Sequence, residues 1–274
     1  MSQDTIINRN NVQISGKGTQ PMLFGHGFGC DQNFWRFVAP AFEEDYRVIL
    51  FDYVGSGKSD RKAYDPQRYS SLSGYAQDVL EICQALDLKD VVFVGHSVSS
   101  MIGLLASIQA PGLFSRLILL GASPCYMNEL PTYQGGFDRA DLEGLLGMMD
   151  KNYLGWANYV APVAMKNPDR PELALELEAS FNATDHYIMK QFAEITFLSD
   201  VRAALPGVSV PALIMQPADD AFVPLHIAKY LQWQLTGSTV AWMKATGHFP
   251  HLSFPDETIQ VIKQYLAQPQ SVLS

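Results

Sequence analysis

The sequence predicts an α/β fold, in which a mainly parallel sheet is covered by helices. Short apolar runs rich in β-forming residues recur along the 274-residue chain, mostly with helical stretches between them. These runs cover residues 21–24, 46–53, 91–94, 116–120, 212–215 and 240–243. Strands that alternate with helices usually lie parallel, with helices on both faces of the sheet. Chemistry in such sheets collects at the carboxyl ends of the strands, so a site is expected in the loops that follow these runs.

The alternation stops between residues 125 and 199, where we expect helices and no strand. The helices are predicted near 138–152, 153–165, 171–181 and 184–198, separated by joints rich in Pro and Asn. The sequence thus predicts a core made of residues 1–124 and 200–274, with 125–199 inserted as a helical lid. Aromatic residues are frequent in this insertion, as over an apolar pocket, although packing between the helices would explain most of them. The residues expected to line a pocket are Phe28, Phe137, Trp156, Tyr159, Phe181 and Phe192.

The composition argues against several classes of partner. The formal net charge is −9 and no basic stripe is present, so neither nucleic acid nor an anionic membrane surface is an expected partner. The three cysteines share no metal-ligand spacing and suit reduced thiols, and we expect no metal and no cofactor. The polar N-terminus lacks the apolar core of a signal peptide, and no run approaches the ~20 apolar residues of a membrane span. We therefore expect a soluble, cytoplasmic protein.

Residues 91–103, VVFVGHSVSSMIG, contain the first chemical signal. Four apolar residues lead into Gly95-His96-Ser97, and an apolar stretch with helical character follows at once. A serine on such a sharp strand-to-helix turn has its Oγ exposed above the end of the sheet, which is the nucleophile elbow. The usual pattern has Gly two residues after the serine, whereas this chain has Ser99. The motif is therefore imperfect and requires partners elsewhere in the chain.

A serine hydroxyl is a weak nucleophile until an imidazole takes its proton and an acid orients that imidazole. His248 lies just past the last predicted strand, and Asp219 and Asp220 lie just past the preceding one. The order Ser, Asp, His along the chain is that of the α/β-hydrolases. Asp220 is favoured over Asp219 because Ala-Phe-Val-Pro, a run that commonly leads into the next helix, follows it. The other histidines have structural or surface interpretations, and they are His26, His96, His186, His226 and His251.

Acyl transfer also needs hydrogen-bond donors for the developing oxyanion, and well-placed backbone N–H groups supply several kcal/mol. The glycine-rich loop GHGFG, residues 25–29, follows the first predicted strand, where such a loop is expected. The donors are predicted to be the N–H groups of Phe28 and Val98. The alternative is that the loop is a glycine-rich turn with no role in catalysis. This alternative is less favoured, because the loop, the serine, the acid and the histidine occur in the order expected of the fold. The histidines and cysteines form no recognisable zinc set.

Seven runs together resemble one group within the α/β-hydrolases, which contains the bacterial stress-response protein RsbQ and the plant karrikin and strigolactone receptors. They are HGFGCDQNFW, ILFDYVGSGKSD, GHSVSSMIG, LFSRLILLGASPCY, YQGGFD, ADDAFVP and GHFPHLS. The resemblance spans nearly the whole chain, and GHSVS is similar to the elbow of the plant receptors. It implies that Ser97 is the nucleophile, Asp220 the orienting acid and His248 the base, with Phe28 and Val98 as oxyanion donors. It also implies a V-shaped lid of four helices over a mostly apolar pocket.

Two functions follow from this interpretation. The first is a serine hydrolase that cleaves an ester or lactone of a small hydrophobic molecule. The second is a ligand-sensing signalling protein, in which slow hydrolysis of a butenolide-type ligand regulates a protein partner such as a stress-response phosphatase. Carbon–carbon bond hydrolases and cofactor-free oxygenases of the same fold can share the three catalytic residue types and are a further alternative. The fold alone cannot name the substrate.

Overall fold

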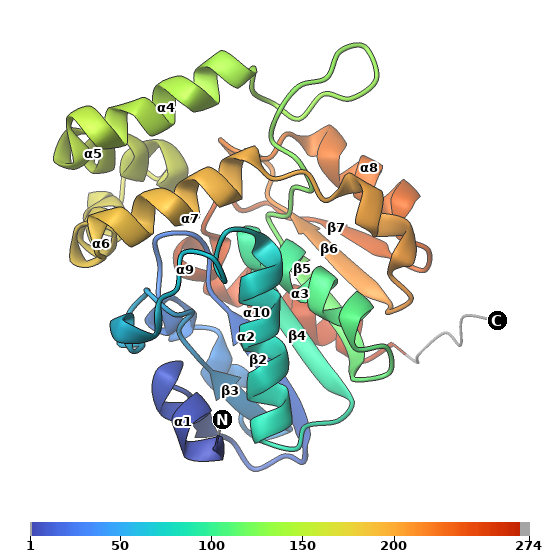
Figure 1. Ribbon diagram of the computed structural model, residues 1–274. Helices are drawn as coiled ribbons and strands as arrows, with labels where there is room; N and C mark the ends of the chain where they lie inside the picture. The colour runs from blue at the N-terminus through green and yellow to red at the C-terminus, as the bar shows by residue number, and fades with distance from the viewer. Residues whose placement is uncertain (1, 269–274) are drawn as a thin grey trace.

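A computed structural model describes residues 2–268 of the chain. Its centre is a seven-stranded sheet in the order β1-β3-β2-β4-β5-β6-β7 (Figure 1). Neighbouring strands are parallel except for β1, which pairs antiparallel with β3 at one edge. The strands are β1 Gln13–Ser15, β2 Gln20–Gly25, β3 Tyr46–Leu50, β4 Val91–His96, β5 Phe114–Leu120, β6 Ala212–Gln216 and β7 Thr239–Trp242.

Helices cover both faces of the sheet, and four of them form a separate layer, the lid, above one end of it (Figure 1). The lid helices are α4 Arg139–Lys151, α5 Tyr153–Met165, α6 Pro171–Ala183 and α7 His186–Leu198. The other α-helices are α1 Gln3–Arg9, α2 Leu72–Ala85, α3 Val98–Gln109, α8 Leu225–Gln234, α9 Pro250–Ser253 and α10 Pro255–Leu266. Short 3₁₀ helices are η1 Gln32–Trp35, η2 Ala39–Phe42, η3 Arg61–Ala63 and η4 Arg202–Gly207.

The central strands contribute to two apolar layers, because successive side chains of a strand point to opposite faces of the sheet. Phe93 and Leu119 belong to the layer that includes α2, α3 and the lid. Val94 and Ile118 belong to the layer that includes α10. All four side chains are fully buried. The middle of the sheet is thus packed on both sides, and this packing fixes the strand ends from which the loops emerge.

The predicted α/β class with a mainly parallel sheet is confirmed. β1 is not among the predicted strands, because Gln13–Ser15 is short, contains a single apolar residue and is exposed throughout. The four lid helices fall inside the predicted insertion, 125–199. The last predicted core segment, 200–274, extends past residue 268, so its end lies outside the described residues.

The chain leaves the sheet after Leu50, although the apolar run predicted a strand as far as Tyr53. Asp52 explains this departure. Its carboxylate accepts hydrogen bonds from the N–H groups of Gln32 and Lys58, at 2.8 and 2.9 Å, so this segment is bonded to loops and not to a strand. Tyr53 is nevertheless fully buried. The apolar run therefore indicated burial correctly and strand length incorrectly.

A buried ionic network fastens the N-terminal helix to α2. Arg9 and Arg68 contact the Asp78 carboxylate at 3.1 and 2.7 Å, and the Tyr69 hydroxyl donates to it at 2.9 Å. Glu81 accepts a hydrogen bond from each of the two guanidinium groups. The side chain of Asp78 is fully buried, so these partners stabilise its charge in place of water.

We expect Asp78→Ala to lower the free energy of unfolding by about 3 kcal/mol, because two guanidinium groups then lose a buried counter-charge. Urea denaturation followed by circular dichroism measures this change. The control is Glu44→Ala, since Glu44 pairs with Lys17 at 2.8 Å where the side chains are 75% and 76% exposed. Exposed pairs contribute about 0–1 kcal/mol, so an effect that small for Asp78→Ala contradicts the role of the network.

Candidate active site

Ser97 lies on the turn between β4 and α3, at the carboxyl end of a central strand. Its backbone has φ 56° and ψ −121°, a sparsely populated conformation with positive φ that costs about 1–3 kcal/mol for a residue with a side chain. Its N–H donates to the Leu120 carbonyl at 2.7 Å, and its carbonyl accepts from the N–H of Ser100 at 2.9 Å. Gly95 allows α3 to pass this close, since a Cβ there would lie 2.6 Å from the Ser99 carbonyl oxygen. The fold thereby presents the Ser97 Oγ above the sheet.

His248 joins Ser97 to Asp220 through two hydrogen bonds. Its Nε2 lies 2.7 Å from the Ser97 Oγ, and its Nδ1 lies 2.7 Å from Oδ2 of Asp220. A carboxylate only accepts, so Nδ1 donates to Asp220, and in the neutral imidazole the lone pair of Nε2 then faces the serine hydroxyl. The other Asp220 oxygen accepts from the N–H groups of Phe222 and Val223, at 2.8 and 3.2 Å. The serine and histidine are only 5% and 4% exposed, so the three side chains are shielded from water.

The two neighbouring aspartates occupy different environments. Asp220 has a fully buried side chain and bonds to His248. Asp219 is 61% exposed and pairs at 2.6 Å with Lys166, which follows α5. Asp220, the aspartate favoured from the sequence, is thus the one that the structure brings to the imidazole.

The backbone of His248 is bonded to the lid. Its N–H donates to the carbonyl of Ala164 in α5 at 2.8 Å. Gly247, with φ 84°, permits this approach, because a Cβ there would lie 2.0 Å from the Met165 carbonyl oxygen. The loop that carries the imidazole and the last turn of α5 are therefore in direct backbone contact.

The other histidines do not join this hydrogen-bonded series. His96 is fully buried, and its Nε2 donates to the backbone carbonyl of His248 at 2.7 Å. His26 is also fully buried, in the loop after β2. His186 and His226 lie at exposed positions of α7 and α8. These positions agree with the structural and surface interpretations of the sequence.

The two predicted oxyanion donors belong to different segments beside Ser97. Val98 is the first residue of α3, so its N–H has no acceptor within the helix. Phe28 lies in the loop after β2, and it lines the same cavity as Ser97. Gly27 lets this loop pack against the elbow, because a Cβ there would lie 2.4 Å from the His96 ring. The structure thus brings both residues next to the serine, and their role as donors stays a prediction.

Ser97 faces a small apolar cavity beneath the lid. Besides Ser97 and His248, its wall includes Phe28, Tyr126, Phe181, Phe197, Phe222 and Phe249. The ring centroid of Phe28 lies 6.0 Å from that of Phe181 and 5.6 Å from that of Phe197. The cavity volume is about 20 Å³, which suffices for about one water molecule. A larger ligand therefore requires these aromatic rings to move.

The predicted pocket residues lie at different depths. Phe28 and Phe181 line the cavity. Trp156 and Phe192 are buried against Phe28, with ring centroids 6.2 and 5.8 Å from its centroid. Phe137 is partly buried, and its ring lies 6.3 Å from an aromatic ring of the cavity wall. Four of these side chains thus form or support one aromatic cluster, and Phe137 lies at its margin.

The prediction that Tyr159 lines the pocket is wrong, because this side chain is 57% exposed. Trp156, Val160 and Ala164 are buried and recur every four residues, so they form the inner face of α5. Tyr159 consequently lies on the outer face. The same spacing is visible in the sequence and is the signal that separates the two faces of this helix.

Tyr126 lines the cavity but is not among the predicted site residues. Burial raises the pKa of Tyr126 above its usual range, while an interaction with Ser97 acts in the opposite direction. The phenol is thus a neutral hydroxyl beside the serine. Phe197, Phe222 and Phe249 also line the cavity without having been predicted. They come from segments far apart in the sequence, and the fold brings them together.

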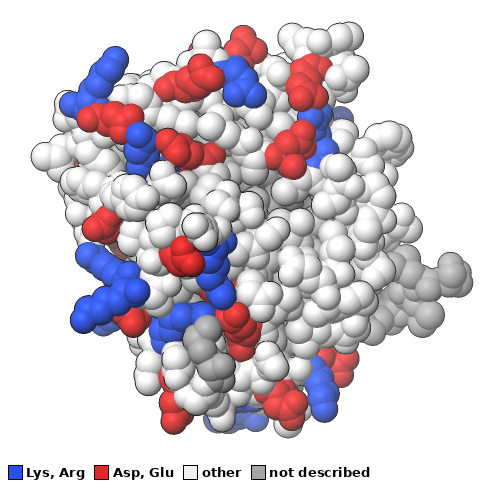
Figure 2. Space-filling model, in the orientation of Figure 1, with Lys and Arg blue, Asp and Glu red and all other residues white. Residues whose placement is uncertain are grey.

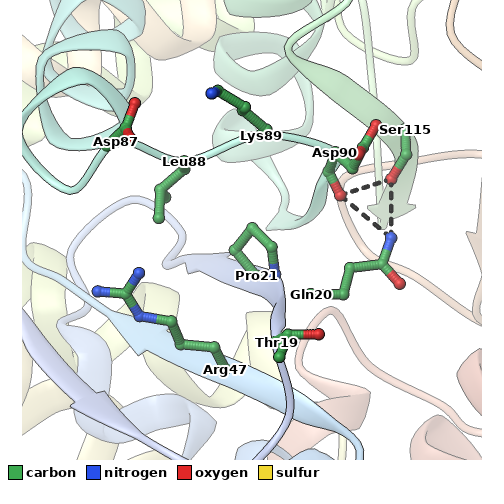
Figure 3. Close-up of a pocket in the computed structure, with 9 residues that line it drawn as sticks. All are labelled: Thr19, Gln20, Pro21, Arg47, Asp87, Leu88, Lys89, Asp90 and Ser115. Carbon is green, nitrogen blue, oxygen red and sulfur yellow. Dashed lines mark hydrogen bonds between the residues drawn. The ribbon is translucent and has the colours of Figure 1, made fainter.

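A second hollow lies at the opposite end of the sheet, near the start of β2, β4 and β5 (Figure 3). It measures about 580 Å³ and is lined mainly by polar residues, including Arg47 and Lys89. Figure 3 shows the Gln20 amide beside Asp90 and Ser115, and its Nε2 donates to the Asp90 carbonyl at 3.1 Å and to the Ser115 Oγ at 3.3 Å. Neither His nor Cys is among its lining residues. The hydrolytic chemistry therefore belongs to the end of the sheet where Ser97 lies.

Acidic and basic side chains are interspersed on the face shown in Figure 2, without a continuous basic area. Within residues 2–268, no cluster of His, Cys, Asp and Glu side chains is arranged to hold a metal ion. In that same range, no helix combines the length and the apolar character that crossing a bilayer requires.

A serine on a strand-to-helix turn, joined to a histidine and an aspartate at the ends of two later strands beneath a helical lid, defines an α/β-hydrolase. A family model described as the alpha/beta hydrolase fold matches residues 20–255. The chain is 39% identical to a strigolactone esterase of Pisum sativum, over 96% of this chain and 98% of the relative. It is 38% identical to a karrikin insensitive 2 receptor of Petunia hybrida, over 94% of this chain and 95% of the relative.

Solved structures give the same assignment. A hydrolase from Oleispira antarctica superposes with a TM-score of 0.96 at 43% identity, over 98% of both chains. An esterase from Exiguobacterium antarcticum, at 23% identity, superposes with a TM-score of 0.86 over 94% of this chain and 95% of the other, which shows a shared fold. The chain belongs to the α/β-hydrolase family. The predicted α/β-hydrolase fold and enzyme class, and the resemblance to the plant strigolactone and karrikin receptors, are confirmed.

We expect Asp220→Asn to lower kcat for a small aryl ester by about 10³–10⁴-fold, because an amide cannot hold the imidazole in the tautomer that accepts the serine proton. Asp219→Asn is the matched control and should change kcat by less than about threefold, since Asp219 forms an exposed pair with Lys166. Steady-state kinetics with p-nitrophenyl acetate measures both effects. The reverse ranking would show that Asp219 is the orienting acid.

We expect His251 to make the stability of the protein depend on pH. It is fully buried against Trp35, with ring centroids 4.5 Å apart, and neither ring nitrogen has a hydrogen-bond partner within the described chain. Burial lowers the pKa of His251 to about 3, with smaller contributions from His248 and Arg36. The unfolded residue has a pKa of about 6.5, so below that pH the unfolded state binds a proton that the folded state does not.

The free energy of unfolding is therefore expected to fall as the pH drops from about 6.5 to about 4, by about 3 kcal/mol from His251 alone. His251→Phe keeps an aromatic ring against Trp35 and should remove this part of the pH dependence. Urea denaturation of both proteins at neutral pH and at about pH 4 measures the difference. An identical pH dependence in the two proteins would refute this account of His251.

Proposed function

We propose that this protein is a serine hydrolase that cleaves an ester or lactone of a small hydrophobic molecule. The observation that carries the proposal is the continuous series of hydrogen bonds from Ser97 through His248 to Asp220, each 2.7 Å long, at the wall of an apolar cavity. A nucleophile, a base and an orienting acid are thus in hydrogen-bond contact with one another.

The first half of the proposed reaction forms an acyl enzyme. The Ser97 Oγ attacks the carbonyl carbon of the substrate while Nε2 of His248 takes the hydroxyl proton. The charge of Asp220 stabilises the imidazolium that results. The N–H groups of Phe28 and Val98 bind the oxyanion, and the imidazolium then gives its proton to the departing alcohol oxygen.

The second half releases the acid. His248 takes a proton from a water molecule, whose oxygen attacks the acyl carbonyl, and the same two N–H groups bind the second oxyanion. The Ser97 oxygen leaves with the proton that the imidazolium returns. With a lactone, the alcohol oxygen stays attached to the acyl chain, so a single hydroxy acid leaves the site.

The cavity wall supports an apolar substrate. Phe28, Phe181 and Phe197 supply aromatic surface, and Tyr126 adds a hydroxyl beside the serine. The cavity of about 20 Å³ holds about one water molecule, so binding of an ester requires these aromatic rings to move. A lactone is the favoured substrate class because relatives from Pisum sativum and Arabidopsis thaliana are named strigolactone esterases.

A second candidate function is a cytoplasmic ligand sensor that hydrolyses a butenolide-type molecule slowly and regulates a partner protein of the stress-response phosphatase type. Relatives of Petunia hybrida that are named receptors favour it. So does the bond from the His248 N–H to the Ala164 carbonyl, through which a change at the serine can reach the lid. A ligand shifts the lid only by its differential affinity for two lid positions.

Ser97→Ala should abolish covalent labelling by a fluorophosphonate probe and product release from a small aryl ester, because the hydroxyl that His248 activates is gone. The melting temperature should stay within a few degrees of the wild type, since only an oxygen atom is lost. Intact-mass spectrometry and an absorbance time course measure the two activities. Persistent labelling of the variant would identify another nucleophile.

The wild-type time course then distinguishes the two candidate functions. Repeated turnover near the enzyme median of about 10 per second favours a metabolic esterase. A single slow turnover of a butenolide-type ligand, or a lasting adduct on Ser97, favours the ligand sensor.

A further inference from the structure

Ser99 stands where the elbow pattern usually has glycine, and its side chain is fully buried. It is the second residue of α3. Its Oγ is hydrogen bonded to the backbone carbonyl of His26 and lies 2.9 Å from the hydroxyl of Tyr53. The start of α3, the loop after β2 and the segment after β3 therefore meet at this one hydroxyl.

The direction of these two hydrogen bonds follows from the groups involved. A carbonyl oxygen only accepts, so the Ser99 hydroxyl donates its single proton to His26. The Ser99 oxygen then accepts from the Tyr53 hydroxyl, which stays protonated because burial raises the pKa of Tyr53. Two hydrogen bonds that polarise each other thus run from Tyr53 to the loop after β2.

The surrounding backbone leaves little room for another arrangement. A Cβ at Gly25 would lie 3.0 Å from both the Ser99 Oγ and the Tyr53 hydroxyl oxygen. The imidazole of His26 is held as well, because its Nε2 accepts from the N–H of Tyr53 at 3.2 Å. His26 is therefore fixed through its carbonyl by Ser99 and through its ring by Tyr53.

We propose that Ser99 is a positioning residue: it holds the loop after β2, so that the N–H of Phe28 points to the oxyanion. This inference rests on the proposed function. The carbonyl that Ser99 holds belongs to His26, two residues before Phe28, whose N–H is the predicted oxyanion donor. A glycine at position 99 would leave this carbonyl without its donor. In this chain the residue two positions after Ser97 therefore allows the close approach of α3 and also fixes one side of the oxyanion site.

The test compares Ser99→Ala with Ser107→Ala. Ser107 lies in the same helix, is buried and donates to the Leu104 carbonyl at 2.7 Å, so the control loses a similar hydroxyl without touching the loop. With p-nitrophenyl acetate, Ser99→Ala should lower kcat by about 10–100-fold and change KM by less than about threefold, because a displaced donor weakens binding of the transition state. Ser107→Ala should keep kcat within about twofold.

Phenylboronic acid gives a readout that a purely structural role would not change. Its boron accepts an electron pair from the Ser97 Oγ while the hydroxyl proton moves to His248, which yields a tetrahedral, negatively charged boronate. Its inhibition constant should rise in Ser99→Ala by the factor by which kcat/KM falls. The melting temperature should fall no further than in Ser107→Ala.

Tyr53→Phe provides a second variant. It retains the hydrogen bond from Ser99 to the His26 carbonyl and loses only the Tyr53 hydroxyl, which donates to the Ser99 oxygen. It should lower kcat by a smaller factor, about 2–10-fold, and raise the boronate inhibition constant in proportion. If Ser99→Ala does not fold, this variant carries the test, and wild-type kcat and boronate inhibition in Tyr53→Phe then overturn the inference.

Wild-type kcat and boronate inhibition in a folded Ser99→Ala overturn the inference, and so does an equal loss of activity in Ser107→Ala. These outcomes are distinct from a failure of the proposed function. A wild-type protein that neither hydrolyses the ester nor binds the boronate through Ser97 contradicts the proposed function itself.

Discussion

Ser97 has a backbone with positive φ, whose N–H donates to the Leu120 carbonyl of β5 and whose carbonyl accepts from the N–H of Ser100 in α3. This constraint sets the geometry of the site, because it turns the chain sharply enough for the Oγ to stand above the sheet while α3 begins at the next residue. The conformation costs about 1–3 kcal/mol, and it persists because the strand before the turn, β4, and the helix after it, α3, are packed in buried apolar layers. His248 and Asp220 follow the ends of later strands, and from there their side chains extend to the Ser97 Oγ and to each other.

The parts of this arrangement that depend on strand ends were predictable from the sequence. Ser97, Asp220 and His248 each follow an apolar run closely, and a parallel sheet gathers the carboxyl ends of its strands at one edge. The pocket wall was less predictable. Whether an aromatic residue of the lid faces the cavity depends on which face of its helix it occupies. The presence of an aromatic residue in the sequence does not identify that face. Tyr159 shows this, because it is aromatic and lies on the outer face of α5.

Hydrogen bonds of buried polar side chains account for the other differences between the sequence pattern and the structure. Asp52 ends β3 early because its carboxylate binds backbone N–H groups of two loops. Ser99 occupies a glycine position because its hydroxyl has an acceptor in the loop after β2. Gln32 lies 20 positions from Asp52, and His26 lies 73 positions from Ser99, so a local pattern does not contain these contacts.

The contact between α5 and the loop of His248 connects the lid to the catalytic base. The N–H of His248 donates to Ala164, and the pair of Lys166 with Asp219 lies beside it. Lifting this end of α5 breaks a backbone hydrogen bond of the residue that serves as base. Movement of the lid at this end and the alignment of the imidazole are therefore coupled through the backbone of His248.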